Sequence, residues 1–575
     1  MKSLFPFFLL VFIFSEASMA QQAGAVLTTT PTYKEVIDQY EQLDKSSDIA
    51  ELKTMGPTNS GFPLHVFIIS GKKCFTKADA DKNQLPVILI NNGIHPGEPD
   101  GIDASLQLAK DILAAPQNYT EILQKVVICI IPVYNIDGAL NRGCCSRANQ
   151  NGPEEYGFRG NAKNLDLNRD FMKLDSKNAE SFVSIFQEWK PHLFIDTHVS
   201  DGADYQYTMT YVVSQKNKMN AKLANYQDNV LLPFIQEKMT NKKMEMTPYV
   251  ETMGETPETG ITAFLETARF STGYAALFDC MGIITETHML KPYNDRVVAT
   301  YWLLFSTLGK MAKDAKQIFD LKNEAIKETA SMKNLSSGWK LDTTKYSEIN
   351  FKGYEAGHKP SEVSGLQRLY YDKTKPYTKT IKNYTEYKST IEIALPSFYI
   401  IPQAWERTID NLKLNGVPVS YLKRDTTIEV ESTYIEKYET VKSPYESHYL
   451  HFDTKIRHEK QTIKFSKGDV IVKMNTPMNR FVAEALEPQA QDSYFNWNYF
   501  DGTLQQKEWF SDYVFEDIAA GLLKEHPELR TQLEEAKKQD ATLNENANAQ
   551  LIWVYRHSRY YEKTHNRLPV FRGIQ

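Results

Sequence analysis

The chain is organised around the stretch Asn91-Asn92-Gly93-Ile94-His95-Pro96-Gly97-Glu98. It follows an apolar run at residues 85–90, which predicts a buried strand, and precedes a helix-like segment that starts near Pro99. His95 and Glu98 would therefore lie on the loop that leaves the carboxyl end of that strand. An imidazole and a carboxylate separated by a Pro-Gly turn can bind one small cation such as zinc from the same side. Because His-x-x-Glu also occurs by chance, the pair is a candidate half-site that needs a third ligand from elsewhere.

Three further apolar runs have the length of strands, and longer amphipathic segments lie between several of them. They cover residues 126–133, 192–199 and 282–287. Strands that alternate with helical segments predict an α/β fold, a three-layer α/β/α domain with a mixed, mostly parallel sheet. Ligands of such sheets bind beyond the carboxyl ends of the strands, so polar residues at those ends are the candidates for a site.

A third ligand is offered by the run that ends in Phe194-Ile195-Asp196-Thr197-His198. A lone His at a strand end is often a satisfied edge residue, but His198 would open onto the same sheet edge as His95 and Glu98. Two ligands close together in sequence and a third much further on, with one position left for water, form the usual layout of a catalytic zinc site. The three residues predict one zinc ion per chain.

A carboxylate stands near the end of the fourth run, Ile283-Ile284-Thr285-Glu286-Thr287-His288. A Glu in such a run is costly to bury without a purpose or a partner. Beside a zinc site, a positioned Glu can take a proton from water and pass it to a leaving amine. Glu286 is the predicted general base, and the alternatives are Glu255, Glu258 and Glu266, which lie in a stretch predicted to be loop.

A dense polar cluster, Asn164-Leu165-Asp166-Leu167-Asn168-Arg169-Asp170-Phe171, is preceded by Arg147 in a polar loop. Arg presents a planar fork that holds a carboxylate at two points, and Asn can donate to the same anion. Asn168 and Arg169 would thus suit the terminal carboxylate of a substrate. Taken alone, the cluster is also compatible with a solvated, self-capping loop.

Together these motifs resemble the zinc carboxypeptidases of the carboxypeptidase A type over about residues 30–315. The matching motifs, in the family's order and at roughly its spacing, are His95-x-x-Glu98, Asp166-x-Asn168-Arg169, His198 and Glu286. The resemblance implies that His95, Glu98 and His198 bind zinc. It also implies that Asp166 orients His95 by contacting the side of its ring that faces away from the metal. It also implies that Glu286 is the general base.

The same resemblance implies how a substrate would be held. Arg147 would polarise the scissile carbonyl, and Asn168 with Arg169 would anchor the terminal carboxylate. The family's mobile substrate-capping Tyr has two candidates here, Tyr274 and Tyr249, and we take Tyr274 as the predicted substrate-binding residue.

The chain departs from the family at Gly97, where the family often has Arg. The pocket for the substrate side chain would lie between about residues 256 and 276, but its floor has no identified residue. The preferred C-terminal residue is therefore not predicted.

The composition limits which other partners and which disulfides are expected. The chain has 575 residues and a formal net charge of -6, with Lys and Arg spread along its length, so nucleic acid is not an expected partner. Five cysteines are too few for a disulfide scaffold, although one or two bridges remain open. Cys129 and Cys280 lie in apolar runs and are predicted to be buried.

Residues 1–20 have a short charged start, an apolar core and small residues before Gln21, which predicts a cleaved signal peptide. An uncleaved amphipathic anchor is the alternative. No later apolar run approaches the roughly 20 residues needed to cross a bilayer, so the expected mature protein is exported, to the periplasm or the medium, without a membrane span.

The rest of the chain is predicted to carry accessory parts. The catalytic domain is expected at residues 26–315, a linker at 316–345, a β-rich accessory domain at 346–475 and a mixed region at 476–575. Aromatic residues at 494–500 could grip a glycan or a partner, but core packing is the prediction.

The sequence thus predicts a zinc metallocarboxypeptidase that hydrolyses C-terminal peptide bonds of substrates with a free terminal carboxylate. The alternatives are an amidase acting on cell-wall peptides or an N-acyl amino acid deacylase with the same site, and a non-catalytic binding protein that keeps the fold.

Overall fold

The computed structural model describes residues 27–574, so the predicted signal peptide at 1–20 lies outside the described residues. Two compact units make up this part of the chain. The first comprises residues 27–395, 414–417 and 475–484, and the second comprises residues 396–413, 418–474 and 485–574. Across residues 27–574, no helix combines the length and apolar character that a membrane span requires.

The first unit is built on an eight-stranded sheet in the order β1-β2-β4-β3-β5-β10-β6-β7. Its strands are β1 (Ala50–Pro57), β2 (Pro63–Ile69), β3 (Val87–Asn91), β4 (Val127–Ile131), β5 (Leu193–Ser200), β6 (Met209–Val213), β7 (Met246–Pro248) and β10 (Met281–His288). The four central strands β4, β3, β5 and β10 are parallel, and antiparallel pairs flank them. Every residue of β3 and β4 is buried, as expected of strands covered on both faces. The predicted strands and the mixed, mostly parallel sheet are confirmed.

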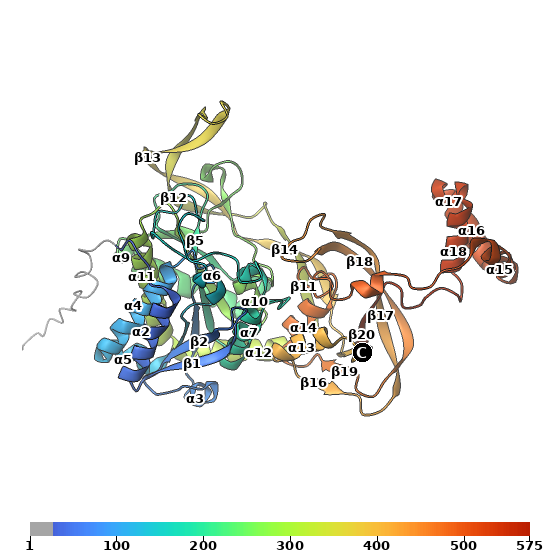
Figure 1. Ribbon diagram of the computed structural model, residues 1–575, viewed down its shortest axis with the longest axis horizontal. Helices are drawn as coiled ribbons and strands as arrows, with labels where there is room; N and C mark the ends of the chain where they lie inside the picture. The colour runs from blue at the N-terminus through green and yellow to red at the C-terminus, as the bar shows by residue number, and fades with distance from the viewer. Residues whose placement is uncertain (1–26, 575) are drawn as a thin grey trace, which may run out of the picture. The chain divides into compact units, whose positions relative to one another are not determined.

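Helices cover both faces of this sheet (Figure 1). One layer contains α2 (Tyr33–Ser46), α4 (Asp100–Ala114), α5 (Thr120–Lys125), α9 (Leu232–Asn241) and α11 (Tyr293–Lys313), and the other contains α7 (Lys177–Trp189) and α10 (Ser271–Ala276). Alternation along β5 fixes the sides: Phe194 packs on α7, whereas Thr197 faces α4. Gly101 lets α4 approach β5, because a Cβ there would lie 2.3 Å from the Cβ of Thr197. This close approach seats the start of α4, just after Glu98, on the sheet edge.

Residues 316–345, which the sequence predicts to be a linker, lie within the first unit. This segment contains helix α12 (Ala315–Ser331) and strand β11 (Asn334–Leu341), and β11 pairs with β14 (Tyr387–Ala394). Most charged residues of α12 lie on its exposed face, while Ile318, Ala325 and Thr329 are buried together with Lys322, which donates to the Pro191 carbonyl. A high content of charged residues therefore does not indicate a linker in this segment.

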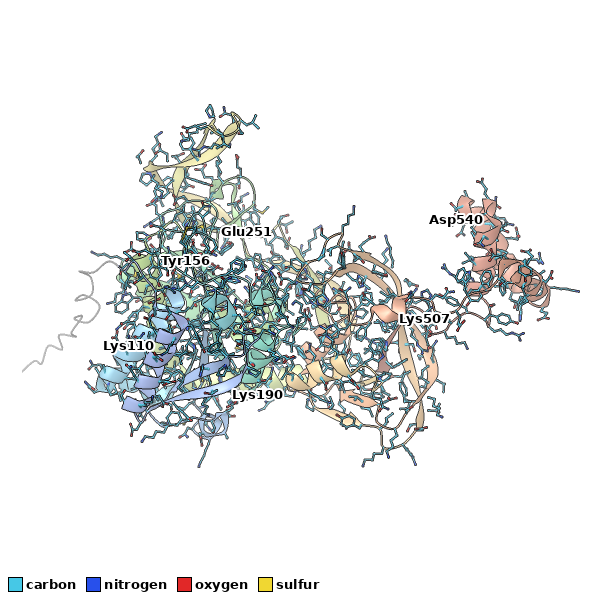
Figure 2. All side chains as sticks on the ribbon, viewed as in Figure 1. Lys110, Tyr156, Lys190, Glu251, Lys507 and Asp540 are labelled. Atoms are coloured by element: carbon cyan, nitrogen blue, oxygen red, sulfur yellow. A yellow bond between two sulfur atoms is a disulfide. The ribbon has the colours of Figure 1, made fainter. Side chains whose placement is uncertain are left out.

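Residues 346–395, assigned from the sequence to an accessory domain, lie in the first unit. Strands β12 (Ser347–Pro360) and β13 (Gln367–Tyr384) form a long antiparallel hairpin, shown in yellow in Figure 1. Strand β13 also pairs with β9 (Ile261–Thr262), and β9 pairs with β8 (Glu251–Thr252). Figure 2 labels Glu251 on β8, near the foot of this hairpin. A four-stranded sheet thus joins the hairpin to the loops that follow β7.

The second unit contains a six-stranded antiparallel sheet in the order β16-β19-β15-β20-β17-β18, which confirms the β-rich C-terminal region. Its strands are β15 (Phe398–Ile401), β16 (Val419–Tyr421), β17 (Thr426–Thr440), β18 (His451–Phe465), β19 (Val470–Lys473) and β20 (Arg567–Gly573). Before β20 come helices α15 (Asp512–Glu525), α16 (Pro527–Gln539), α17 (Ala541–Glu545) and α18 (Ala547–Arg556). Residues of α15, α16 and α18 share a core of their own. The aromatic residues at 494–500 are buried, so core packing is confirmed for them.

The cysteines behave mostly as expected. Cys129 and Cys280 are buried free thiols, which confirms the prediction, and Cys74 is a third. Cys144 and Cys145 form a disulfide with each other in the loop that leads to Arg147.

Candidate active site

The His95-x-x-Glu98 motif forms a tight turn directly beyond β3. The Glu98 backbone N–H donates to the His95 carbonyl at 2.8 Å, which turns both side chains toward the same side. His198 lies near the carboxyl end of β5, the strand beside β3 in the sheet. The three predicted ligands therefore meet at one sheet edge, although 100 residues separate Glu98 from His198.

The three side chains are arranged to hold a cation. They are almost fully buried, and one ligand atom from each lies within 4.8 Å of the others. Glu98 Oε1 is 3.2 Å from His95 Nδ1, and Glu98 Oε2 is 3.2 Å from His198 Nδ1. His95 Nδ1 is buried and has no hydrogen-bond partner within residues 27–574. A buried, unpartnered imidazole nitrogen beside a carboxylate and a second imidazole fits the N/O donor set of zinc.

Carboxylates hold both imidazoles from behind. His95 Nε2 lies 2.9 Å from Asp166, and His198 Nε2 lies 2.9 Å from Asp196. With a metal bound, such contacts would hold the proton on Nε2, so that each Nδ1 offers its lone pair to the ion. The predicted contact between Asp166 and His95 is present, whereas the role of Asp196 was not predicted. Asp196 also accepts a hydrogen bond from Asn91 at the end of β3.

We expect Asp166→Asn and Asp196→Asn each to weaken zinc binding by about 10–100-fold without abolishing it, because partners behind the ligands typically have effects of that size. The zinc dissociation constant, measured by competition with a chelator, checks this. Asp137→Asn is the matched control, because this buried carboxylate accepts N–H groups of Ser60 and Ala162 and contacts no ligand. Unchanged zinc affinity in both variants would show that the two carboxylates do not support the metal ligands.

Two arginines approach the Glu98 carboxylate. Arg147 donates to Glu98 Oε1 at 2.7 Å, and Arg159 approaches the same oxygen to 3.5 Å. Burial favours a raised pKa for Glu98, but Arg147 and the two histidines outweigh it and hold this pKa well below its ordinary value. Glu98 is therefore ionised, as a metal ligand must be.

Glu286 lies beside this centre. It is on β10, in register with His198 on the parallel neighbour β5, so the two side chains emerge on the same face. Burial raises the pKa of the Glu286 carboxyl to about 8, with the positive charge of His198 opposing the rise. A carboxylate with such a raised affinity for protons is suited to proton transfer.

The three alternative bases have other partners. Glu255 contacts His358 at 2.9 Å and Glu258 contacts Lys379 at 2.6 Å, and both Glu side chains are exposed. Glu266 is buried and accepts hydrogen bonds from the backbone N–H and the hydroxyl of Thr272, which joins it to the first turn of α10. These contacts account for each carboxylate structurally.

The Asp166-x-Asn168-Arg169 motif forms a 3-10 turn capped by Asp166, which accepts the Asn168 N–H at 2.8 Å. Arg169 stacks on the ring of Phe270 at 4.3 Å, and the amide oxygen of Asn168 accepts the N–H of Ser271. Because Asp166 also contacts His95, the turn brings the two predicted anchor residues beside the metal ligands.

Tyr274 lies away from this group, in the hydrophobic core. It is fully buried, its hydroxyl donates to Asn415 at 2.7 Å, and its ring packs on Phe186 and Phe278. The predicted substrate contact does not fit this placement. Tyr249, the other candidate, is partly exposed, and burial together with the charge of Glu286 raises its pKa.

Sequence reasoning also missed Arg159. Its Nε donates to Asp166 at 3.0 Å, its side chain is 45% exposed, and it borders Glu98. By contrast, Arg147 is 17% exposed and donates to Glu98, the Val199 carbonyl and Gln150. Its backbone N–H also donates to the hydroxyl of Tyr156, which is labelled in Figure 2. The available signal was the position of Arg159 in the polar loop that leads to Asp166.

A two-His, one-Glu centre at the carboxyl edge of a mixed sheet, with a neighbouring carboxylate and arginines, defines a metallopeptidase type of site. The comparison with known families agrees: the zinc carboxypeptidase family model matches residues 36–333, and the chain belongs to that family. It is a metallopeptidase enzyme.

Curated relatives are named as carboxypeptidases. Carboxypeptidase 2 of Trichophyton equinum is 20% identical over 455 residues, which covers 75% of this chain and 77% of the relative. Carboxypeptidase 2 of Trichophyton rubrum is 21% identical over 436 residues, which covers 71% and 72%. Among solved structures, a metallo-carboxypeptidase from Burkholderia cenocepacia matches with a TM-score of 0.38 at 15% identity, covering 49% of this chain and 70% of that one.

Proposed function

We propose that the protein removes C-terminal residues from peptides, using zinc held by His95, Glu98 and His198. The unpartnered, buried Nδ1 of His95, facing Glu98 and His198, carries this proposal. Zinc bound there supplies Lewis-acid chemistry, which lowers the pKa of a water molecule and polarises a carbonyl.

The chain's own residues would carry the proton and the charge. The ionised Glu286 would take a proton from the attacking water and pass it to the leaving amine nitrogen, because it lies one strand from His198 and burial raises its affinity for a proton. Arg159 keeps a partly exposed guanidinium beside Glu98, so it can donate to the oxyanion that develops at the scissile carbonyl.

Asn168 and Arg169 support the choice of a C-terminal bond. The turn that contains them is fixed to His95 through Asp166, so a carboxylate bound by this pair would lie a short distance from the metal ligands. A substrate bound in this way would present its last peptide bond to Glu286. Tyr249, which is partly exposed, would be the Tyr that closes over such a substrate.

The test combines metal analysis with a matched set of substrates. We expect about one zinc per chain in the reconstituted protein, loss of that zinc in His198→Ala, and cleavage of peptides with a free C-terminus but not of their C-terminal amides. Absence of zinc, full occupancy in His198→Ala, or equal cleavage of both peptide series would overturn the proposal. Including N-acyl amino acids and cell-wall peptides in the screen distinguishes the two alternative hydrolases.

The two arginines can be separated by substitution. We expect Arg159→Met to lower kcat by about 10²–10³-fold, the usual effect of removing one oxyanion donor. Arg147→Met should mainly weaken zinc affinity, because Arg147 donates to Glu98. Steady-state kinetics and zinc titration of both variants check this, and the reverse pattern would return the carbonyl contact to Arg147, as first predicted.

Export to the periplasm or the medium is part of the proposal. The apolar segment in residues 1–20 supports it. N-terminal sequencing of the protein recovered from its native host tests it, with a mature start near Gln21 as the expected result.

A further inference from the structure

The tip of the β12–β13 hairpin carries two aliphatic side chains in water. The hairpin is formed by strands of 14 and 18 residues and projects from the first unit (Figure 1). In the turn at residues 361–366, Val363 is 99% exposed and Leu366 is 71% exposed. Neither side chain contributes to the core, so only a partner outside the unit could bury them.

The turn is internally hydrogen-bonded. The Ser361 N–H donates to the Leu366 carbonyl at 2.7 Å, and the Gly365 N–H donates to the Ser361 carbonyl at 2.8 Å. The Ser361 hydroxyl accepts from the N–H groups of Val363 and Ser364. Because these backbone donors already have partners, the turn can leave bulk water at a reduced cost.

Positive charge surrounds the aliphatic pair. Lys359 and Arg368 are directly opposite each other on the two strands, an arrangement that destabilises a hairpin. Within residues 27–574, neither has an ion-pair partner. The hairpin, residues 347–384, contains seven Lys or Arg and four Asp or Glu, whereas the whole chain has a net charge of -6. Glu362 is the acidic residue of the turn.

Tyrosine rings stiffen the hairpin behind this charge. Tyr377 lies over Gly353 and Tyr370 lies over Gly357, and in each pair the two residues are cross-strand partners. Aromatic cover of cross-strand glycines stabilises a two-stranded ribbon that would otherwise be marginal. Lys359 lies over the ring of Tyr370 as well.

We propose that this tip docks on an anionic lipid surface. Val363 and Leu366 would enter the interface, Lys359 and Arg368 would pair with the lipid phosphates, and Tyr370 would lie at the level of the headgroups. An aliphatic apex followed by unpaired cations and an aromatic ring matches the layered polarity of such a surface. A protein partner would require no such order.

The foot of the hairpin reaches the neighbourhood of the active site. Tyr205, Tyr207 and Ile261 form a core cluster with Phe351 and Ile381 of the hairpin. Tyr205 follows the end of β5, the strand that carries His198, by five residues. Because the tip lies about ten residues of strand beyond Phe351, roughly 30 Å, a docked tip would tether the catalytic edge at about that distance from the lipid surface.

Vesicle binding tests the proposal without use of the enzymatic activity. We expect the full chain to sediment with vesicles of phosphatidylglycerol and phosphatidylcholine, and not with pure phosphatidylcholine. Lys359→Gln with Arg368→Gln should weaken this binding by about 30-fold, and added salt should do the same. Val363→Asp with Leu366→Asp should weaken it at least about tenfold.

Tyr513→Asp with Val514→Asp is the matched control. These residues are exposed apolar positions on α15, and the substitutions change the charge by the same amount. The control should bind vesicles like the wild type, and all variants should keep the wild-type melting temperature and their turnover of a water-soluble peptide. Failure of the wild type to bind anionic vesicles, or unchanged binding by the tip variants, would overturn the proposal.

Discussion

Glu286→Gln is expected to keep its zinc and bind substrate, yet to lose about 10²–10⁴-fold in kcat, the usual effect of removing a general base. Gln preserves the shape of the side chain but cannot accept the proton of the attacking water. The residue lies in register with His198 and is not itself within the group of three metal ligands, so metal affinity should change little. Steady-state kinetics on a short peptide, together with zinc analysis of the same preparation, check both parts.

Glu266→Gln is the control for this prediction. Glu266 is also buried, and burial raises its pKa too, but its hydrogen bonds run to Thr272 in α10. The variant should lose some stability and keep its kcat within about tenfold. If Glu266→Gln is inactive while Glu286→Gln turns over normally, the assignment of the base is wrong.

The elements that the sequence could predict share one property, which is that a short local pattern fixes them. Residues 85–90 and 192–199 are continuous apolar runs between turns, and such runs can be buried as parallel strands only in a covered sheet. Once those strands are parallel neighbours, His95 and His198 must emerge at the same edge. The metal site was therefore within reach of sequence reasoning.

Asp196 was also within reach but was overlooked. It stands two residues before His198 in a strand, and alternation puts both side chains on one face. A carboxylate inside an apolar strand needs a partner, and the imidazole two residues on supplies it.

Other features depend on contacts that no local pattern carries. The sequence makes Tyr274 a candidate for contacting substrate, but in the structure its hydroxyl donates to Asn415, which is 141 residues away in the chain. Likewise, Arg147 and Arg159 both precede Asp166 in polar loops, and only the folded loops show that one is largely enclosed while the other is half-exposed. Helix α12 lies in the segment that the sequence assigns to a linker, because the contacts of its buried face come from distant parts of the first unit.

Arg296→Met is expected to destabilise the first unit by about 3–5 kcal/mol, because it leaves a buried charge without its partner. The Arg296 side chain is fully buried, and its Nε donates to Asp100 Oδ2 at 2.9 Å. The terminal guanidinium N–H groups donate to Asp100 Oδ1 and to the backbone carbonyls of Asn151, Gly152 and Lys291. Asp100 begins helix α4 two residues after Glu98, so this ion pair joins the metal-binding turn to two loops and to the start of α11. Urea denaturation of wild type and variant measures the loss.

Two comparisons make this second prediction sharp. Lys222→Met removes a cation from an exposed pair with Glu324 and Glu328, and surface pairs of this kind contribute about 0–1 kcal/mol. Arg296→Met leaves the buried Asp100 carboxylate without its partner. The double variant Asp100→Leu with Arg296→Met removes that carboxylate as well, so it should be more stable than Arg296→Met alone. If Arg296→Met and Lys222→Met destabilise the protein equally, the buried pair is not what holds the metal-binding turn to the sheet edge.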